Sequence, residues 1–205
     1  LGKCRMDFYR LAINDLTPTG MQPFKSDKSM LMCNGEIYNH KKFRTGYEKG
    51  TSDCEILIPM IEYFGVLETL DMINGDFAFV YTDGKKVIAA RDPVGVRPLF
   101  YTRYAENSIA FASEAKALLF LNSKIHIFPP GHIYDSYLDD FVCYNSGYWR
   151  VNKYVNDCTP SEIRQTFEHS VHERLATTER DIGFLLSGGL DSSLIASIAT
   201  RKLGK

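Results

Sequence analysis

The stretch that most constrains the fold is residues 183–193, which read GFLLSGGLDSS. Its apolar residues predict a strand over 182–186, and a helix is expected over 192–203. Between them, Gly188 and Gly189 allow a tight turn whose backbone amides face one point, beside the positive end of the helix. A strand, glycine turn and helix in this order predict a phosphate-binding loop in an α/β unit.

The spacing within this loop decides its type. Neither GxxxxGK[ST] nor GxGxxG occurs in the chain, which excludes the Walker and dinucleotide loops. SGGLDSS instead resembles the pyrophosphate loop of ATP pyrophosphatases. The carboxylate of Asp191 would repel a phosphate unless a cation lay between them, so Asp191 indicates Mg²⁺. The alternative is a serine-rich helix cap that follows a buried strand.

Composition excludes several classes of protein. The 205 residues are 44% hydrophobic and 24% charged, with a net charge of −1, as in ordinary globular proteins that do not bind nucleic acid or anionic lipid. No apolar run is long enough for a membrane span and no signal peptide is recognisable, so a cytoplasmic protein is expected. The five cysteines are widely spaced and without CxxC, so neither disulfides nor zinc are expected.

Most of the first 150 residues predict short strands. A capping box at Ser52 and Glu55 predicts a helix that ends at Gly65, and Ser113 is expected to cap a second helix over 114–121. Asn34-Gly35 interrupts an apolar strand, which indicates either a bulge or a close backbone approach to a ligand. Asp83-Gly84, between two of the expected strands, predicts a β-hairpin. The pattern as a whole favours packed antiparallel sheets. The expected strands are 6–14, 30–38, 77–82, 86–91, 99–103, 109–112, 133–137 and 141–144.

Composition changes near residues 147–150, and a new helix start follows. Thr159 can cap this helix, Pro160 suits its first position, and Glu162 completes a capping box. The apolar residues Ile163, Phe167, Val171 and Leu175 then form one stripe.

Seven motifs in order resemble the family of glutamine-hydrolysing asparagine synthetases, which join a class II glutamine amidotransferase to a pyrophosphate-loop synthetase. The resemblance implies a glutamine amidotransferase domain over 1–150 and the beginning of an asparagine synthetase domain over 159–205. The first would be an α+β four-layer αββα sandwich of the N-terminal-nucleophile hydrolase type, incomplete here, and the second the start of an α/β adenine-nucleotide pyrophosphatase fold. The motifs are RLAI (10–13), CNGEIYNH (33–40), SDCE (52–55), NGDFAF (74–79), Arg91-Asp92 with Gly95 and Pro98, SEAKAL (113–118) and SGGLDSS (187–193).

The resemblance implies a glutamine site. Arg10 would pair with the α-carboxylate of glutamine, and the backbone near Leu11 and Ile13 would add hydrogen bonds. Glu36 and Asp53 would accept from the α-ammonium. The Asn34 side-chain amide and the Gly35 backbone N–H would form an oxyanion hole. Without the resemblance, Arg10 would be a cation at a strand edge and Asp53 an ordinary first-turn acid.

The resemblance also implies an ATP site and a reaction. The full protein would be an ATP-dependent carbon–nitrogen ligase in which ammonia from glutamine amidates aspartate, with AMP and pyrophosphate as products. ATP and Mg²⁺ would be its cofactors, glutamine, aspartate and ATP its ligands, and a homodimer its expected assembly. The ATP and pyrophosphate contacts would be Leu185, Leu186, Ser187, Gly188, Gly189, Asp191 and Ser192, with Asp191 also on the metal.

The chain departs from the family at its first residue. The family nucleophile is an N-terminal cysteine whose own amine acts as base, whereas this sequence starts at Leu1. Cys4 does not replace it, because it lies too close to Arg10 and carries no free α-amine. Asp76 also departs from the family, and no part in the chemistry is expected of it. We therefore expect an inactive fragment truncated at both ends.

Two alternatives stay open at this point. One is a related amide- or β-lactam-forming synthetase, in which the same ATP loop activates a different carboxylate; the retained glutamine-binding set argues against it. The other is a regulatory homologue that keeps the pocket without the nucleophile.

Overall fold

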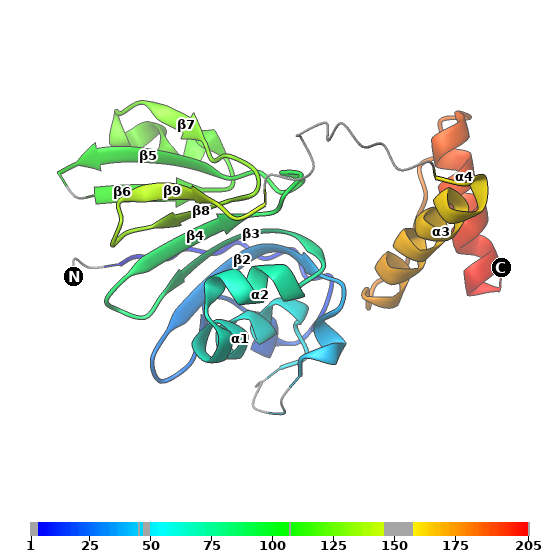
Figure 1. The fold of residues 1–205 in the computed structure, drawn as a ribbon, viewed down its shortest axis with the longest axis horizontal. Helices are drawn as coiled ribbons and strands as arrows, with labels where there is room; N and C mark the ends of the chain where they lie inside the picture. Colours follow the sequence, from blue (N-terminus) through cyan, green and yellow to red (C-terminus); the bar gives the residue numbers. More distant parts are fainter. Residues whose placement is uncertain (1–3, 45, 47–49, 107, 146–157, 205) are drawn as a thin grey trace.

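The computed structural model describes residues 4–44, 46, 50–106, 108–145 and 158–204. Figure 1 shows two groups of elements: sheets and short helices up to residue 145, and a pair of helices from residue 159 onward. The predicted change of domain at 147–150 lies outside the described residues and stays a prediction.

The largest element is a six-stranded antiparallel sheet of order β1-β2-β3-β4-β8-β9. In β2 and β3 the register sets Cys33 opposite Phe79 and Glu36 opposite Asp76. The hairpin predicted around Asp83-Gly84 is confirmed, and Gly84 has φ +77°, which suits glycine best. The strands are β1 (Phe24–Lys25), β2 (Met30–Ile37), β3 (Gly75–Thr82), β4 (Val87–Arg91), β8 (His132–Asp135) and β9 (Asp140–Cys143).

A smaller sheet of order β6-β5-β7 faces one side of the first (Figure 1). Its strands are β5 (Phe100–Ala105), β6 (Ser108–Ala112) and β7 (Ile125–Ile127). Side chains that alternate along the strands of both sheets meet between them. This core comprises Ala78, Ala89, Leu99, Phe128 and Tyr134, with Val80, Tyr101, Ile109, Phe111 and Phe141 packed around it.

Short helices cover the other face of the six-stranded sheet. They are the 3-10 turn η3 (Asp53–Ile56), α1 (Leu57–Phe64) and α2 (Val66–Met72). Gly65, at φ +88°, separates α1 from α2 and ends the predicted helix where expected. The helices bury Ile56, Leu57, Met60, Ile61 and Leu70 against the sheet residues Leu31, Cys33, Ile37, Phe77, Phe79, Tyr81 and Ile88.

The capping box predicted at Ser52 is wrong. The Ser52 side chain makes no cap hydrogen bond, and the helix begins as a 3-10 turn. The Glu55 side chain instead binds the loop before the helix, where its Oε2 accepts from the amide N of Gly50 at 3.0 Å. The helix start is therefore held by the preceding loop. Three further 3-10 turns are η1 (Pro18–Gly20), η2 (His40–Lys42) and η4 (Ala115–Leu121), the last beginning after Glu114 without a cap from Ser113.

The first group of elements thus stacks in four layers. The helices η3, α1 and α2, the six-stranded sheet, the three-stranded sheet and η4 follow one another. This arrangement confirms the predicted αββα sandwich. Among the described residues, no helix combines the length and the apolar character that a membrane crossing requires.

The second group is a pair of helices, α3 (Pro160–Ala176) and α4 (Leu190–Leu203). The capping box predicted for α3 is confirmed: Thr159 Oγ1 accepts from Glu162 N at 3.3 Å, and Glu162 Oε2 accepts from Thr159 N at 2.8 Å. Val171 of α3 packs on Ile198 and Ala199 of α4. Only part of the expected apolar stripe of α3 packs between the two helices, because Ile163 stays 61% exposed.

Two predicted strands, 6–14 and 182–186, are wrong. Both segments lack strand structure, because neither lies in a ladder with one of the described strands. The first segment is instead tied to the chain after α3. Glu179 N donates to Ile13 O at 3.1 Å, and Arg180 Nε donates to Ala12 O at 3.0 Å.

Candidate functional site

Strand β2 carries three of the predicted glutamine contacts in a row. Cys33 and Ile37 point into the helix-covered core, so Asn34 and Glu36 belong to the opposite face, toward the smaller sheet. Asn34 Nδ2 donates to Ser113 Oγ, just beyond β6, at 3.3 Å. The side-chain amide is therefore held at the rim between the two sheets.

Gly35 lies where only glycine fits. A Cβ at this position would come within 2.3 Å of the Asp76 carbonyl oxygen and 2.7 Å of Phe77 Cα. The pairing of β2 with β3 is nevertheless continuous through Asn34 and Gly35. Of the two alternatives for Asn34-Gly35, the bulge is therefore wrong, and close approach of the neighbouring strand requires glycine here.

Asp53 lies against the end of β2. It is 4% exposed, and its Oδ2 accepts from the amide N of Ile37 at 2.7 Å. The thiol of Cys54 also lies 3.6 Å from Oδ2. Asp53 is thus both the first residue of η3 and a link between that turn and β2, so the two acids Glu36 and Asp53 are near neighbours.

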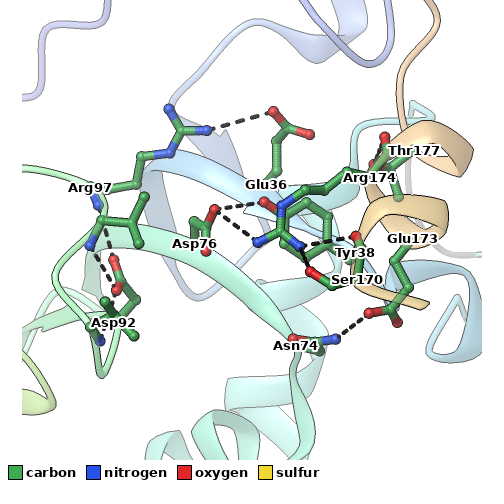
Figure 2. A network of polar contacts seen from close by, with 12 residues as sticks. Glu36, Tyr38, Asn74, Asp76, Asp92, Arg97, Ser170, Glu173, Arg174 and Thr177 are labelled. Carbon is green, nitrogen blue, oxygen red and sulfur yellow. Dashed lines mark hydrogen bonds and ion pairs between the residues drawn. The ribbon is translucent and has the colours of Figure 1, made fainter. Parts of the chain in front are cut away.

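Glu36 is surrounded by charges of both signs. Burial raises its pKa above the ordinary value, and the neighbouring carboxylates Asp53 and Asp76 raise it further, while the cations Arg97 and Arg174 act in the opposite direction. Arg97 Nη2 lies 3.6 Å from Glu36 Oε1 (Figure 2). Glu36 is therefore a carboxyl group whose charge depends on its neighbours.

Arg97 is positioned by a tight turn within the motif of Arg91-Asp92, Gly95 and Pro98. Asp92 is 1% exposed. Its Oδ1 accepts from the amides of Val94, Gly95 and Val96 at 3.1, 2.5 and 2.9 Å, and its Oδ2 from that of Arg97 at 3.0 Å. The Asp92-Pro93 start of the turn was the available signal for such a cap.

The side chain of Arg10 does not point toward the acids in this structure. Its Nη1 donates to Thr17 O at 2.7 Å, and its Nη2 to Asn14 O at 3.0 Å and to Asp15 O. The alternative interpretation of Arg10 as a strand-edge cation is therefore wrong, because residues 6–14 form no strand and the guanidinium closes a loop. Its predicted pairing with the α-carboxylate of glutamine stays a prediction. Leu11 is 85% exposed, and Ile13 O is engaged by Glu179.

Asp15 joins that loop to the segment before Asp53, and sequence reasoning missed it. It is 1% exposed with φ +51°, and its Oδ2 accepts from Thr51 N at 2.8 Å and Thr19 Oγ1 at 3.0 Å. Burial opposes the charged form, but hydrogen bonds from Thr17, Thr51 and Thr19 outweigh it and lower the pKa of Asp15. Asp15 thus holds the Arg10 loop beside the Asp53 loop.

The predicted phosphate loop forms a glycine turn that leads into α4. Gly188 has φ +84° and Gly189 is the N-cap residue of the helix. Ser187 Oγ lies 3.2 Å from Ser192 Oγ and accepts from Gly189 N at 3.3 Å. Two hydroxyls and a helix N-terminus therefore meet at one point, with both flanking leucines, Leu185 and Leu186, solvent-exposed.

The cysteines and the acids offer little else for catalysis or metal binding. All five cysteines are free, and Cys33 and Cys54 are buried. A side-chain hydrogen bond with Cys33, together with burial, raises the pKa of the Cys54 thiol well above its usual value. Asp191 lies exposed in the first turn of α4. Within the described ranges, no three His, Cys, Asp or Glu side chains gather as a metal site.

Two family models match the chain. That of the glutamine amidotransferase domain matches residues 2–149, and that of asparagine synthase matches residues 162–205. Asparagine synthetase [glutamine-hydrolyzing] 3 of Arabidopsis thaliana is 43% identical, and asparagine synthetase [glutamine-hydrolyzing] 1 of Saccharomyces cerevisiae is 42% identical. These alignments cover 98% and 96% of this chain and 36% of each relative, so the chain spans about a third of their length.

Solved structures support the fold alone. Glutamine phosphoribosylpyrophosphate amidotransferase of B. subtilis superposes with a TM-score of 0.51 at 18% identity, over 88% of this chain and 47% of that one. A second structure, described as the allosteric regulatory enzyme of purine biosynthesis, gives 0.53 at 17% identity, over 91% and 48%. Over 98% of its own length the chain is similar to glutamine-hydrolysing asparagine synthetases. The sandwich, the motifs along it and the family match over residues 2–149 together mean that this chain belongs to the glutamine amidotransferase domain family.

Proposed function

We propose that the chain is the glutamine-binding part of a glutamine-hydrolysing asparagine synthetase, followed by the first part of its ATP site. The observation that carries this proposal is the pair of carboxylates Glu36 and Asp53 beside Gly35, at the end of β2. A buried acid, Asp53, next to a half-buried one, Glu36, is unfavourable in isolation, and the α-ammonium of an amino acid would satisfy both. The resemblance to asparagine synthetases over nearly the whole chain supports the same assignment.

The remaining glutamine contacts are proposed from the resemblance to glutamine-hydrolysing asparagine synthetases. The side-chain amide of Asn34 and the backbone N–H of Gly35 are the proposed donors to the developing oxyanion. Arg10 would bind the α-carboxylate by giving up its loop carbonyls, which exchanges neutral acceptors for a charged one. Leu11 and Ile13 would contribute backbone groups. Binding of glutamine is therefore expected to rearrange the loop that Asp15 holds.

The second half of the proposal is the loop at Ser187. Its glycine turn, two serine hydroxyls and helix N-terminus suit the phosphates of ATP. Leu185 and Leu186 would lie beside the nucleotide. Asp191 is the proposed ligand of Mg²⁺ together with phosphate oxygens, since it is an exposed carboxylate on the same turn. The cation would offset the charge of the departing pyrophosphate.

Isotope transfer tests the proposed reaction in the complete protein. It is incubated with glutamine labelled with ¹⁵N in the side-chain amide, aspartate, ATP and Mg²⁺, and the products are separated by mass spectrometry. The proposal predicts ¹⁵N in the side-chain amide of asparagine, together with AMP and pyrophosphate in equal amounts. Label in a different amide, or label only in free ammonium with ATP unused, would overturn the assignment.

A further inference from the structure

Helix α3 reaches the glutamine-binding strand through one arginine. Arg174 Nη2 lies 3.6 Å from Asp76 Oδ2, and its guanidinium carbon lies 4.5 Å from the centre of the Tyr38 ring (Figure 2). Its Nη1 donates to Ser170 Oγ at 2.8 Å and to Ser170 O at 3.1 Å. The guanidinium is thus held in one orientation from both sides, as a cation over an aromatic face and beside a carboxylate.

Asp76 connects this arginine to Glu36. Tyr38 donates its hydroxyl to Asp76 Oδ2 at 2.7 Å. Asp76 on β3 is also the register partner of Glu36 on β2, so their side chains leave the sheet on the same face. No part in the chemistry was expected of Asp76, yet it lies between the proposed ammonium acceptor Glu36 and α3.

Other contacts fix α3 independently of this ion pair. Asn74 Nδ2 donates to Glu173 Oε2 at 2.9 Å, and Lys41 Nζ donates to Ala176 O at 3.1 Å. Loss of the Arg174 charge therefore leaves two tethers between the last turns of α3 and the sandwich. An electrostatic effect of Arg174 can for this reason be separated from loss of docking.

The charges that face Glu36 come from four elements. Asp53 on η3 and Asp76 on β3 oppose its ionisation, as does burial, while Arg97 from the 92–98 turn and Arg174 from α3 favour it. Arg174 acts across Asp76, whose charge it offsets. Without it, Glu36 would face two carboxylates with Arg97 as the remaining cation of this set.

We propose that Arg174 is a positioning residue of the glutamine site, which offsets Asp76 and so keeps Glu36 charged as the acceptor for the ligand's α-ammonium. The inference rests on the proposed function. It makes the affinity for glutamine depend on a residue of α3, the helix that precedes the ATP loop. By thermodynamic reciprocity, glutamine in turn stabilises the docking of α3 on the sandwich.

The test is a calorimetric titration of the chain with L-glutamine between pH 5 and pH 8. Four proteins are compared: wild type, Arg174→Gln, Arg174→Lys and the double variant Asp76→Asn/Arg174→Gln. The matched control is Arg164→Gln, an exposed arginine of the same helix that pairs with Glu168. Hydrogen exchange of the α3 amides, measured in parallel, reports whether the helix stays docked.

We expect Arg174→Gln to weaken binding at pH 5 more than at pH 8, by about two- to fivefold, the range of a partly exposed ion pair. The acid limb of its affinity profile moves to higher pH. Arg174→Lys keeps most of the wild-type profile, and the double variant regains it because both charges are gone. Arg164→Gln changes nothing.

Two results would overturn the inference. One is a profile of Arg174→Gln that keeps the wild-type pH dependence. The other is a loss of glutamine affinity in Arg174→Gln that the double variant Asp76→Asn/Arg174→Gln does not restore, together with faster hydrogen exchange along α3. That combination would mark Arg174 as a structural contact. Absence of glutamine binding by the wild type at every pH would instead overturn the proposed function, and this inference with it.

Discussion

Replacement of Asp53 by asparagine separates its two possible roles. As a structural residue, Asp53 accepts from the Ile37 amide at 2.7 Å, and asparagine can do the same through Oδ1 while losing the charge. As a ligand residue, it contributes a negative charge to the α-ammonium of glutamine, which asparagine cannot replace. The two roles therefore predict different ratios between lost stability and lost affinity.

The magnitudes follow from the hydrogen bonds involved. A bond to a charged group contributes about 1.5–3 kcal/mol and a neutral one about 0.5–1.5 kcal/mol. Replacing the charged acceptor of the Ile37 amide by a neutral one should then cost about 1 kcal/mol of stability, or about 2–4 °C in Tm for a chain of this size. Loss of the contact with the ammonium should raise the Kd for glutamine by about 10- to 160-fold.

Calorimetric titration with L-glutamine and thermal unfolding are measured on the same samples. Asp139→Asn is the control, because Asp139 is an exposed acid that pairs with Arg103 in a remote part of the sandwich. We expect it to leave the affinity unchanged. A drop in Tm of Asp53→Asn with an affinity within about twofold of wild type would refute the ligand role and leave Asp53 as a structural acid.

Three further predictions concern other parts of the chain. Gly35→Ala should destabilise the fold by about 1–3 kcal/mol through overpacking against β3, measured by urea unfolding, whereas Gly183→Ala, with open space around the position, should be near neutral; equal effects would contradict the close approach. Asp15→Asn should lower the free energy of unfolding most above about pH 4. Because the pKa of Asp15 is lowered in the folded state, its carboxylate stabilises the fold above the unfolded-state pKa and loses this effect as pH falls through the folded-state pKa. A difference in urea midpoint between wild type and variant that is the same at pH 7 and pH 3 would contradict this. Asp191→Asn in the complete protein should retain glutamate release but lose pyrophosphate release across a Mg²⁺ titration; an unchanged pyrophosphate rate with wild-type metal dependence would reduce Asp191 to a helix cap.

The sequence predicted elements whose causes are local. The capping box at Thr159 needs only Glu162 three residues later, and the hairpin at Gly84 needs only a turn residue between alternating strands. Both are present as expected. The same holds for most of the strands of the sandwich, whose apolar alternation records which face is buried.

What the sequence could not supply depends on contacts between distant segments. Residues 6–14 alternate like a strand but find no ladder partner among the described strands, and Ile13 is taken up by Glu179 instead. The box at Ser52 is displaced because Glu55 binds Gly50. The links that Asp15 and Asp76 make to other segments also arise only in three dimensions, since Thr51 and Tyr38 lie more than thirty residues away in the chain.

The most direct test of the glutamine site is a map of backbone amide shifts in the ¹⁵N-labelled chain as L-glutamine is added. We expect saturable shifts at Gly35, Glu36, Ile37 and Asp53, and also in the Arg10 loop as its guanidinium turns to the ligand. None of these shifts is expected with D-glutamine. Unmoved amides in β2, or shifts confined to residues outside this site, would contradict the central claim that β2 and η3 together bind the amino-acid end of glutamine.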